Sequence, residues 1–104
     1  MHIVLYRFRV KSNKEEDFIK GWKGLTELIY KYEGSLGSRL HKGDELDYIA
    51  YAQWPDKLTF EASGQNLPEQ ANKYRTLMRA SCSKIEVLQK MDVVEDLLKN
   101  EKSE

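Results

Sequence analysis

The stretch 46-LDYIAYAQWP-55 decides the fold, because it has the composition of a β-strand and carries large side chains on both of its faces. Side chains alternate between the two faces of a strand. One face carries Tyr48, Ala50, Ala52 and Trp54, and the other carries Ile49, Tyr51 and Gln53. A two-layer protein needs only one apolar face on each strand. The second face therefore predicts a further cover, either a second copy of the chain or a ligand.

Length and charge limit the kind of protein. The chain has 104 residues, which suits one domain with a modest core, and we expect a single domain over residues 1–98 and a frayed tail over residues 99–104. Its 17 basic and 17 acidic side chains give a formal net charge of zero, whereas nucleic-acid-binding proteins usually carry a basic excess. No apolar run approaches the roughly 20 residues that span a bilayer, and the N-terminus lacks a signal-peptide pattern. We expect a cytoplasmic protein with no nucleic-acid or membrane partner.

The first third of the chain predicts a strand followed by a long helix. Residues 2–10 alternate as a strand does, with His2, Val4, Tyr6, Phe8 and Val10 on one face. Ser12 and Asn13 precede Glu15 and Glu16 by three residues, a capping-box spacing that predicts a helix start near residue 13. An apolar stripe at helical spacing follows, made by Phe18, Trp22, Leu25, Ile29 and Tyr32. Gly34 is expected to end this helix.

The middle of the chain predicts a hairpin and a short helix. Strands are expected at 35–42 and 46–54, joined by a turn at Gly43 and Asp44. Pro55 and Asp56 suit the first turn of a helix, whose packing residues would be Leu58, Phe60 and Ala62. Breakers at Gly64, Asn66 and Pro68 predict that this helix is short.

The remaining chain predicts one more helix and one more strand. The helix would run from Pro68 to about Ser81, with a narrow apolar stripe of Ala71, Tyr74 and Met78. In the strand at 84–94, Ile85, Val87, Gln89, Met91 and Val93 would share one face. Residues 95–104 suit either a short helical turn or an extension that grips a partner. The single cysteine, Cys82, cannot form an intramolecular disulfide, and we expect a structural or incidental role for it.

The order of elements predicts an α+β fold of the ferredoxin-like split β-α-β-β-α-β type, with the second helix broken in two. Such a fold has one antiparallel four-stranded sheet with its helices on a single face, so the other face is open. Three of the strands place apolar residues on both faces, and an exposed apolar face of that size is a liability in a monomer. We therefore expect a two-fold homodimer packed sheet against sheet.

Four segments carry a family resemblance: YRFRV at 6–10, YEGSLGSRLH at 32–41, YIAYAQWPDKLTFEASG at 48–64 and MRASCSKIEVLQKMDVVEDLL at 78–98. Together they resemble the antibiotic biosynthesis monooxygenase (ABM) family. The resemblance implies a dimeric α+β barrel built from two ferredoxin-like sheets, with a pocket between sheet and helices in each subunit. Enzymes of the family oxidise quinols, anthrones or related phenolic polycycles with molecular oxygen, often without metal or flavin.

A related branch of the family degrades haem. It carries an asparagine on the first strand, a tryptophan after the third strand and a histidine on the following helix. This chain has Tyr6 and Ser63 at the first two positions, and 68-PEQANKYRTLMRA-80 contains no histidine. Two separated histidines and one cysteine also give no metal-ligand spacing, and no glycine-rich phosphate loop is present. We therefore expect no haem, metal or other cofactor.

The resemblance directs attention to residues that could bind an aromatic substrate and stabilise its anion. The predicted substrate-binding residues are Tyr6, Phe8, Trp22, Trp54, Tyr74 and Arg79, and the predicted catalytic residues are His41, Arg39 and Tyr51. His41 is the natural general base, because it titrates near neutrality when unperturbed. Each residue also has a plainer role open to it: Trp22 lies on the core stripe of its helix, and His41 lies near a hairpin turn that water reaches.

Three functions remain open from the sequence. The leading hypothesis is a cofactor-independent monooxygenase or related oxidoreductase that acts on a phenolic, quinol-like or polycyclic aromatic compound. The alternative is a non-catalytic dimeric protein, with a ligand-binding or stress-related role, that holds a small apolar molecule in the same pocket. A third hypothesis is an isomerase or decarboxylase, because related dimeric barrels host proton-transfer chemistry.

Overall fold

A computed structural model describes residues 1–99 of the chain. In chain order the elements are β1 (His2–Val10), α1 (Glu15–Tyr32), β2 (Gly37–Lys42), β3 (Asp47–Trp54), α2 (Lys57–Glu61), α3 (Ala71–Ala80) and β4 (Cys82–Asp92). This order confirms the expected β-α-β-β-α-β arrangement with a divided second helix. Within residues 1–99, no helix is long and apolar enough to cross a membrane. The predicted frayed tail at 99–104 lies almost wholly outside the described residues.

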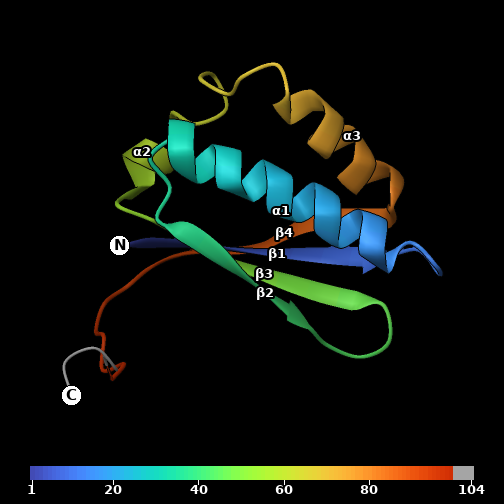
Figure 1. Cartoon of the computed structure of the whole chain (residues 1–104). Coiled ribbons are helices and arrows are strands. Elements are labelled where there is room, and N and C mark those ends of the chain that lie inside the picture. Colours follow the sequence, from blue (N-terminus) through green and yellow to red (C-terminus); the bar gives the residue numbers. More distant parts are fainter. Residues whose placement is uncertain (100–104) are drawn as a thin grey trace.

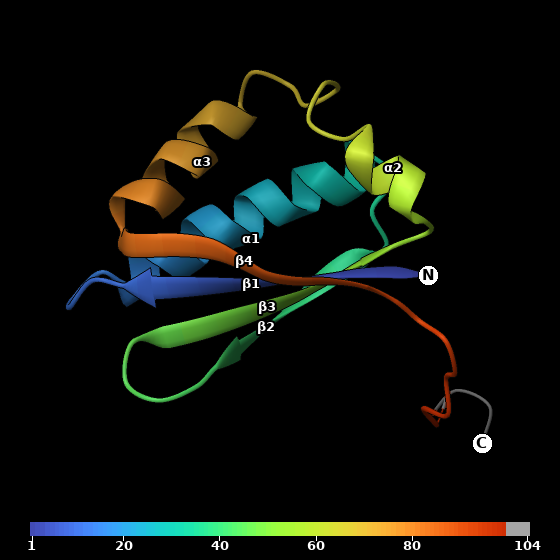
Figure 2. The ribbon, with the colours of Figure 1, turned by 180° about the vertical axis from the view of Figure 1, so that it is seen from behind.

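The four strands form one antiparallel sheet in the order β2-β3-β1-β4. Within residues 1–99 all three helices lie on the same side of this sheet, and the other side carries no helix (Figure 1). Seen from behind, the sheet keeps the helices above it, and the chain after β4 descends below it (Figure 2). We call the two sides the covered face and the open face. This is the predicted ferredoxin-like fold.

The covered face holds the core, because paired residues of neighbouring strands direct their apolar side chains to this same face. Tyr6 pairs with Ala50 and Phe8 pairs with Tyr48 in the β1–β3 ladder, so these side chains point the same way. The Phe18 side chain of α1 is fully buried against them, with its ring centroid 5.0 Å from Phe8 and 5.1 Å from Tyr48. The small side chain of Ala50 leaves room above the sheet, which is where the cavity described below lies.

Helices α1 and α3 approach closely through a glycine. A Cβ atom placed on Gly21 would lie 2.7 Å from the backbone nitrogen of Met78 and 2.9 Å from the carbonyl oxygen of Tyr74. Backbone atoms cannot yield as a flexible side chain does, so only glycine fits here. The contact fixes α3 over the covered face, and with it the arginines of that helix.

The prediction for the start of α1 was wrong in its details. The helix begins at Glu15, two residues later than expected, and no side chain caps it. Asn13 adopts a left-handed backbone conformation with φ of 66°, and Lys14 donates its backbone N–H to the Lys11 carbonyl. Residues 11–14 therefore form a turn, which removes Ser12 and Asn13 from capping positions. The predicted stop was confirmed, because Gly34 follows the helix with φ of 81°.

The short helix α2 was predicted correctly at its start and wrongly in its packing. Asp56 caps it by accepting the backbone N–H of Thr59 at 2.8 Å. Phe60 packs against Trp54, with ring centroids 5.4 Å apart. Leu58, however, is 77% exposed, because a helix of five residues presents only one turn to the sheet and Phe60 occupies it. Helix α3 likewise begins at Ala71 instead of Pro68.

The face prediction for the last strand was also wrong. The β1–β4 register shifts between Leu5 and Tyr6, so that Leu5 pairs with Gln89 and Tyr6 with Val87. This bulge leaves Leu88 as an extra residue and reverses the alternation. Ile85 and Val87 consequently belong to the covered face, whereas Gln89 and Met91 belong to the open face. Residues 93–99 form no helix or strand.

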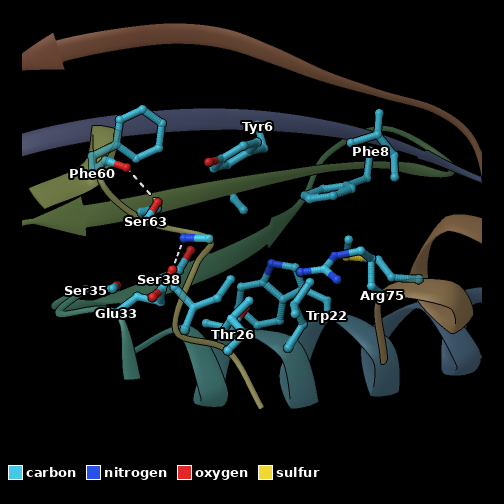
Figure 3. A pocket seen from close by; sticks show the side chains of 18 of the residues that line it. Tyr6, Phe8, Trp22, Thr26, Glu33, Ser35, Ser38, Phe60, Ser63 and Arg75 are labelled. Carbon is cyan, nitrogen blue, oxygen red and sulfur yellow. Dashed lines mark hydrogen bonds between the residues drawn. The ribbon is translucent and has the colours of Figure 1, made fainter. Parts of the chain in front are cut away.

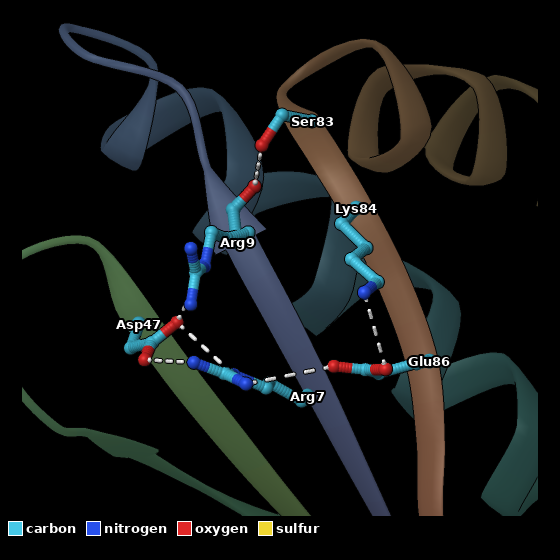
Figure 4. A network of polar contacts seen from close by, with 6 residues as sticks. All are labelled: Arg7, Arg9, Asp47, Ser83, Lys84 and Glu86. Carbon is cyan, nitrogen blue, oxygen red and sulfur yellow. Dashed lines mark hydrogen bonds and ion pairs between the residues drawn. The ribbon is translucent and has the colours of Figure 1, made fainter.

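The open face carries a network of ion pairs at one end (Figure 4). Arg7 Nη2 lies 2.7 Å from Asp47 Oδ2, and Arg9 Nε lies 3.3 Å from the other oxygen of the same carboxylate. Arg7 Nη1 also lies 3.6 Å from Glu86 Oε1, and Lys84 Nζ lies 3.6 Å from Glu86 Oε2. Towards the opposite end the face is more apolar: Ile3 is buried, Leu5 and Tyr51 are half-buried, and the half-buried Ile49 lies beside Arg7.

Candidate functional site

A cavity of about 500 Å³ lies between the covered face of the sheet and the helices. Its walls are mostly aromatic and aliphatic, and Figure 3 shows them from close by. The aromatic side chains that line it are Tyr6, Phe8, Trp22, Trp54 and Phe60. The volume falls within the range of small-molecule sites, which are mainly apolar with a few placed polar groups. An aromatic compound of two or three fused rings suits these walls.

The Tyr6 hydroxyl is the central polar group of this cavity. It stands on β1 and, as Figure 3 shows, lies between the rings of Phe60 and Phe8. Within residues 1–99 it has no hydrogen-bond partner. Burial raises the pKa of Tyr6 above its usual value, so at neutral pH the side chain keeps its proton. Tyr6 can therefore donate a hydrogen bond to an oxygen atom of a bound molecule.

Two arginines of α3 supply positive charge on the cavity wall. Arg75 and Arg79 are one helical turn apart, and both line the cavity. Arg75 donates to Asn72 Oδ1 at 3.0 Å, whereas Arg79 makes no ion pair with any described residue. A guanidinium group that is free in this way can neutralise an oxyanion of a ligand.

Glu33 holds the loop between α2 and α3 over the cavity. Its side chain is buried, and its carboxylate accepts the backbone N–H groups of Gly64 and of Asn66, the latter at 3.0 Å. Ser63, Gly64 and Leu67 of this loop line the cavity, and Figure 3 shows the loop beside Glu33. A buried carboxylate that accepts hydrogen bonds from two backbone amides binds strongly. These bonds hold the loop in place as one wall of the cavity.

The structure brings together five of the predicted substrate-binding residues: Tyr6, Phe8, Trp22, Trp54 and Arg79 all line the cavity. Tyr74 does not line it. Its ring lies against α1, so close that a Cβ atom on Gly24 would be 2.4 Å from it. Tyr74 therefore belongs to the contact between the two long helices.

The predicted catalytic residues lie elsewhere. Arg39, His41 and Tyr51 all point to the open face, because Arg39 pairs with Tyr51 and His41 with Ile49 across the β2–β3 ladder. Arg39 and Tyr51 line a second cavity of about 380 Å³ at the β2 edge, where Trp22 also contributes. His41 lines neither cavity, and its Nδ1 lies 3.2 Å from the Ile49 carbonyl oxygen.

Several cavity residues were missed by the sequence prediction, among them Glu33, Phe60 and Arg75. Arg75 could have been found, because it precedes Arg79 by four residues and so shares its helix face. Phe60 was recognised only as a packing residue. Glu33 follows the last turn of α1, and no sequence pattern indicates that its carboxylate binds a loop 31 residues away.

Cys82 is not a candidate nucleophile. The thiol is buried where β4 begins, and burial raises its pKa to about 11, although Lys11 opposes the shift. Since the thiolate is the reactive form, almost none is present at neutral pH. Among residues 1–99, no group of three or more histidine, cysteine or acidic side chains is placed to hold a metal ion.

Comparison with protein families adds a match over most of the chain. The sequence model of the family described as "Antibiotic biosynthesis monooxygenase" matches residues 1–68, a segment that contains β1, α1, the β2–β3 hairpin and α2. In a comparison with curated proteins, no sequence matches the chain.

Solved structures show the same fold. SnoaB, a cofactor-independent oxygenase from Streptomyces nogalater, superposes with a TM-score of 0.74 at 18% identity, covering 94% of this chain and 97% of its own. A putative antibiotic biosynthesis monooxygenase from Caulobacter crescentus gives 0.74 at 17% identity and covers 90% of each chain. Rv0793 from Mycobacterium tuberculosis gives 0.72 at 9% identity, covering 93% of this chain and 98% of its own. At these identities the similarity establishes the fold.

Proposed function

Because the chain belongs to the antibiotic biosynthesis monooxygenase family, we propose that it is a cofactor-independent oxygenase that acts on a hydroxylated polycyclic aromatic compound. The observation that carries the proposal is the aromatic-walled cavity, which is lined by Arg75, by Arg79 and by Tyr6, whose hydroxyl has no hydrogen-bond partner within residues 1–99. The similarity in fold to the cofactor-independent oxygenase SnoaB supports it.

The proposed reaction needs no external reductant. In an anthrone-type substrate the carbon opposite the carbonyl group is a CH₂ group, and loss of one proton gives an electron-rich enolate. This anion reduces O₂ directly, one oxygen atom forms the new C=O bond, and the other leaves as water with the two hydrogens of the CH₂ group. The carbon loses four electrons and O₂ gains four, so electrons and atoms are balanced without another reactant.

The cavity residues would favour the anion on which this chemistry depends. Tyr6 would donate a hydrogen bond to the substrate oxygen, and Arg75 and Arg79 would offset its negative charge. The apolar walls would reduce the number of water molecules around the substrate, which strengthens these interactions. The catalytic roles predicted for Arg39 and Tyr51 require a substrate in the second cavity, so they remain a separate prediction. His41 lines neither cavity.

We further propose that two copies of the chain pack through their open faces. The apolar end of that face, formed by Ile3, Leu5, Ile49 and Tyr51, carries no helix within residues 1–99, and Leu5, Ile49 and Tyr51 are only half-buried. Exposed apolar side chains continue below the sheet after β4, where Val94 is 94% and Leu97 is 87% exposed. A face-to-face dimer would bury both regions, which is the homodimer that the sequence predicts.

Oxygen uptake tests the proposed activity. The purified protein would be given anthrones, naphthohydroquinones and hydroquinones, with the spontaneous oxidation of each compound subtracted. Uptake above that background, matched by quinone formation and unchanged by chelators, is the expected result. Loss of product under strict anaerobiosis would separate an oxygenase from an isomerase or decarboxylase.

The Tyr6→Phe variant ties the activity to the cavity. Removal of this hydroxyl should lower kcat/KM about ten- to a hundredfold, in the lower part of the range for groups that stabilise an oxyanion. Tyr32→Phe is the matched control, because it removes the same atom from a tyrosine that lines neither cavity. Equal losses in both variants would contradict the assignment. Saturable quenching of tryptophan fluorescence without oxygen uptake would favour the ligand-binding function instead.

A further inference from the structure

Two buried nitrogen atoms have no hydrogen-bond partner among the described residues: His2 Nε2 and Trp54 Nε1. The two residues are 2% and 4% exposed. They are direct partners in the β1–β3 ladder, so their side chains stand next to each other on the covered face. A buried polar group without a partner destabilises the fold, and such groups are rare enough to require an explanation.

The contact with Asp92 determines whether His2 Nε2 is a hydrogen-bond donor or a hydrogen-bond acceptor. His2 Nδ1 lies 2.8 Å from Asp92 Oδ1. An ionised carboxylate can only accept a hydrogen bond, so in the neutral histidine the proton lies on Nδ1 and Nε2 presents its lone pair. Trp54 Nε1 is a donor only. The unpaired atoms are therefore one acceptor and one donor, a combination that a single hydroxyl group satisfies.

The Phe60 ring connects this pair with the cavity. Its centroid lies 5.6 Å from that of His2 and 5.4 Å from that of Trp54. Phe60 and Trp54 line the cavity, whereas His2 does not. Phe60 belongs to α2, a helix of five residues in which none is buried. A weakly anchored helix can shift at low cost, and displacement of the Phe60 ring would extend the cavity to His2.

We infer that His2 and Asp92 form a proton-accepting pair for the hydroxyl group of an aromatic ligand, reached when the Phe60 ring moves aside. The identity of the ligand class rests on the proposed function. The phenol O–H bond breaks as the Nε2–H bond forms, and the Asp92 carboxylate faces the resulting imidazolium. The phenolate oxygen keeps the electron pair and accepts a hydrogen bond from the Trp54 indole. The arrangement repeats the logic of a histidine oriented by a carboxylate.

The charged groups around His2 come from three elements. Asp92 and Lys90 belong to β4, and the Lys90 ammonium lies 5.6 Å from the Phe60 ring centroid. Asp56 caps α2; the Thr59 amide holds the pKa of this carboxyl below its usual value, and the N-terminal ammonium and His2 add to the effect. Asp92 by its hydrogen bond and Asp56 by its charge therefore favour the imidazolium that proton transfer would create, whereas the positive charges of Lys90 and of the N-terminal ammonium oppose it.

The test uses a nitronaphthol, whose ionised form absorbs at a longer wavelength than its neutral form. Binding is followed by quenching of tryptophan fluorescence, and the ratio of ionised to neutral probe is measured on the bound compound across pH. In wild-type protein, the ionised form should be favoured relative to the free probe. The His2→Gln variant should lower that ratio about tenfold, which is one pKa unit of the bound phenol.

Asp92→Asn is the second variant. Because the Asp92 side chain is 69% exposed, this substitution should leave the fold intact even if His2→Gln does not. An amide can donate to Nδ1, which moves the histidine proton to Nε2 and removes the acceptor, so the ratio should fall as in His2→Gln. In Phe60→Ala the ratio should equal or exceed that of the wild type. His41→Gln is the matched control, since His41 lies on the open face, and it should leave the ratio unchanged.

The outcomes separate this inference from the proposed function. Binding with the same ionisation ratio in wild type, His2→Gln and Asp92→Asn overturns the His2–Asp92 assignment and leaves the oxygenase proposal to the oxygen-uptake assay. Absence of nitronaphthol binding to the wild type overturns the assignment together with the proposed role of the cavity.

Discussion

The two faces of the sheet use the same strands for different purposes. On the covered face, aromatic rings and the small residues Ala50 and Ala52 meet the helices and leave a cavity. On the open face, the same strands present ion pairs around Arg7 and Asp47 at one end and apolar side chains at the other (Figure 4). Large side chains on both faces of a strand therefore need not indicate two cores. One face forms the core, and the other is suited to an interface.

This comparison also explains which charges can act on a ligand. The Arg7 guanidinium is already paired with the Asp47 carboxylate. The hydrogen bond from Arg7 to Asp47 raises the pKa of Arg7 and holds its side chain in place. Arg79, by contrast, lines the cavity and has no acidic partner among residues 1–99. A cation already paired with a carboxylate stabilises structure, whereas an unpaired cation beside a cavity is available for an anionic ligand.

The largest expected effect concerns the covered face. Phe18→Ala should lower the free energy of unfolding by about 3–5 kcal/mol, because the side chain is fully buried and its loss leaves a cavity. Urea titration followed by far-UV circular dichroism measures the change. Tyr30→Ala is the control on the same helix, since Tyr30 is 59% exposed; its effect should stay within about 0.5 kcal/mol. Similar losses in both variants would show that the covered face is not the dominant core.

The next effect concerns the open face. Leu5→Asp places a charge in the apolar end of that face and should weaken the proposed dimer about a hundredfold or more, because a charge buried without a partner is costly. Sedimentation velocity over a range of protein concentrations measures the dissociation constant. Leu58→Asp is the matched control, because the same change is made on the helix side at an exposed position. A wild-type chain that is monomeric at all concentrations would contradict the dimer.

The smallest effect concerns the ion pairs of the open face. The Arg7 hydrogen bond holds the pKa of Asp47 below its usual value, so the carboxylate contributes stability above the pKa of an unfolded aspartate, about 3.9. That stability is lost as the pH falls through the lower, folded value. Asp47→Asn should therefore reduce stability at pH 7, and the difference from wild type should shrink below about pH 4.

Thermal unfolding of both proteins between pH 2 and pH 8 measures this difference, on the order of a few degrees at most for a half-exposed pair. Glu69→Gln serves as a control, because Glu69 is exposed and makes no ion pair with a described residue. A constant gap between the Asp47→Asn variant and wild type over the whole pH range would contradict the assigned role of the Arg7–Asp47 pair.

The sequence predicts the fold well because its signals are local. The alternation in β1 places Tyr6 and Phe8 on one face, and β3 follows the same rule. The bulge at Leu88 could not be predicted, because no glycine or proline marks it, and it reverses the faces of Gln89 and Met91. In a regular strand, alternation says which residues share a face, but it does not say which face meets the helices.

That limit explains the outcome for the candidate site. Tyr6 and Trp54 were predicted for the pocket and line it, whereas His41 was chosen for its titration and lies on the other side of the sheet. His2 was placed on the same face as Tyr6 by alternation, and its pairing with Asp92 across 90 positions could not be seen. Residues that act together here come from opposite ends of the chain, and only the register of β1 against β4 joins them.

The irregular course of β4 has a consequence for the solubility of the protein. This strand lies at the edge of the sheet with exposed Val87 and Leu88, and an exposed apolar edge invites uncontrolled pairing with the edges of other molecules. The register shifts twice along β4, so its outer row of N–H and C=O groups is not evenly spaced, and Lys84 and Lys90 add charge. A regular strand from another molecule cannot continue the ladder along its full length, and the chain is thereby protected against edge-to-edge aggregation.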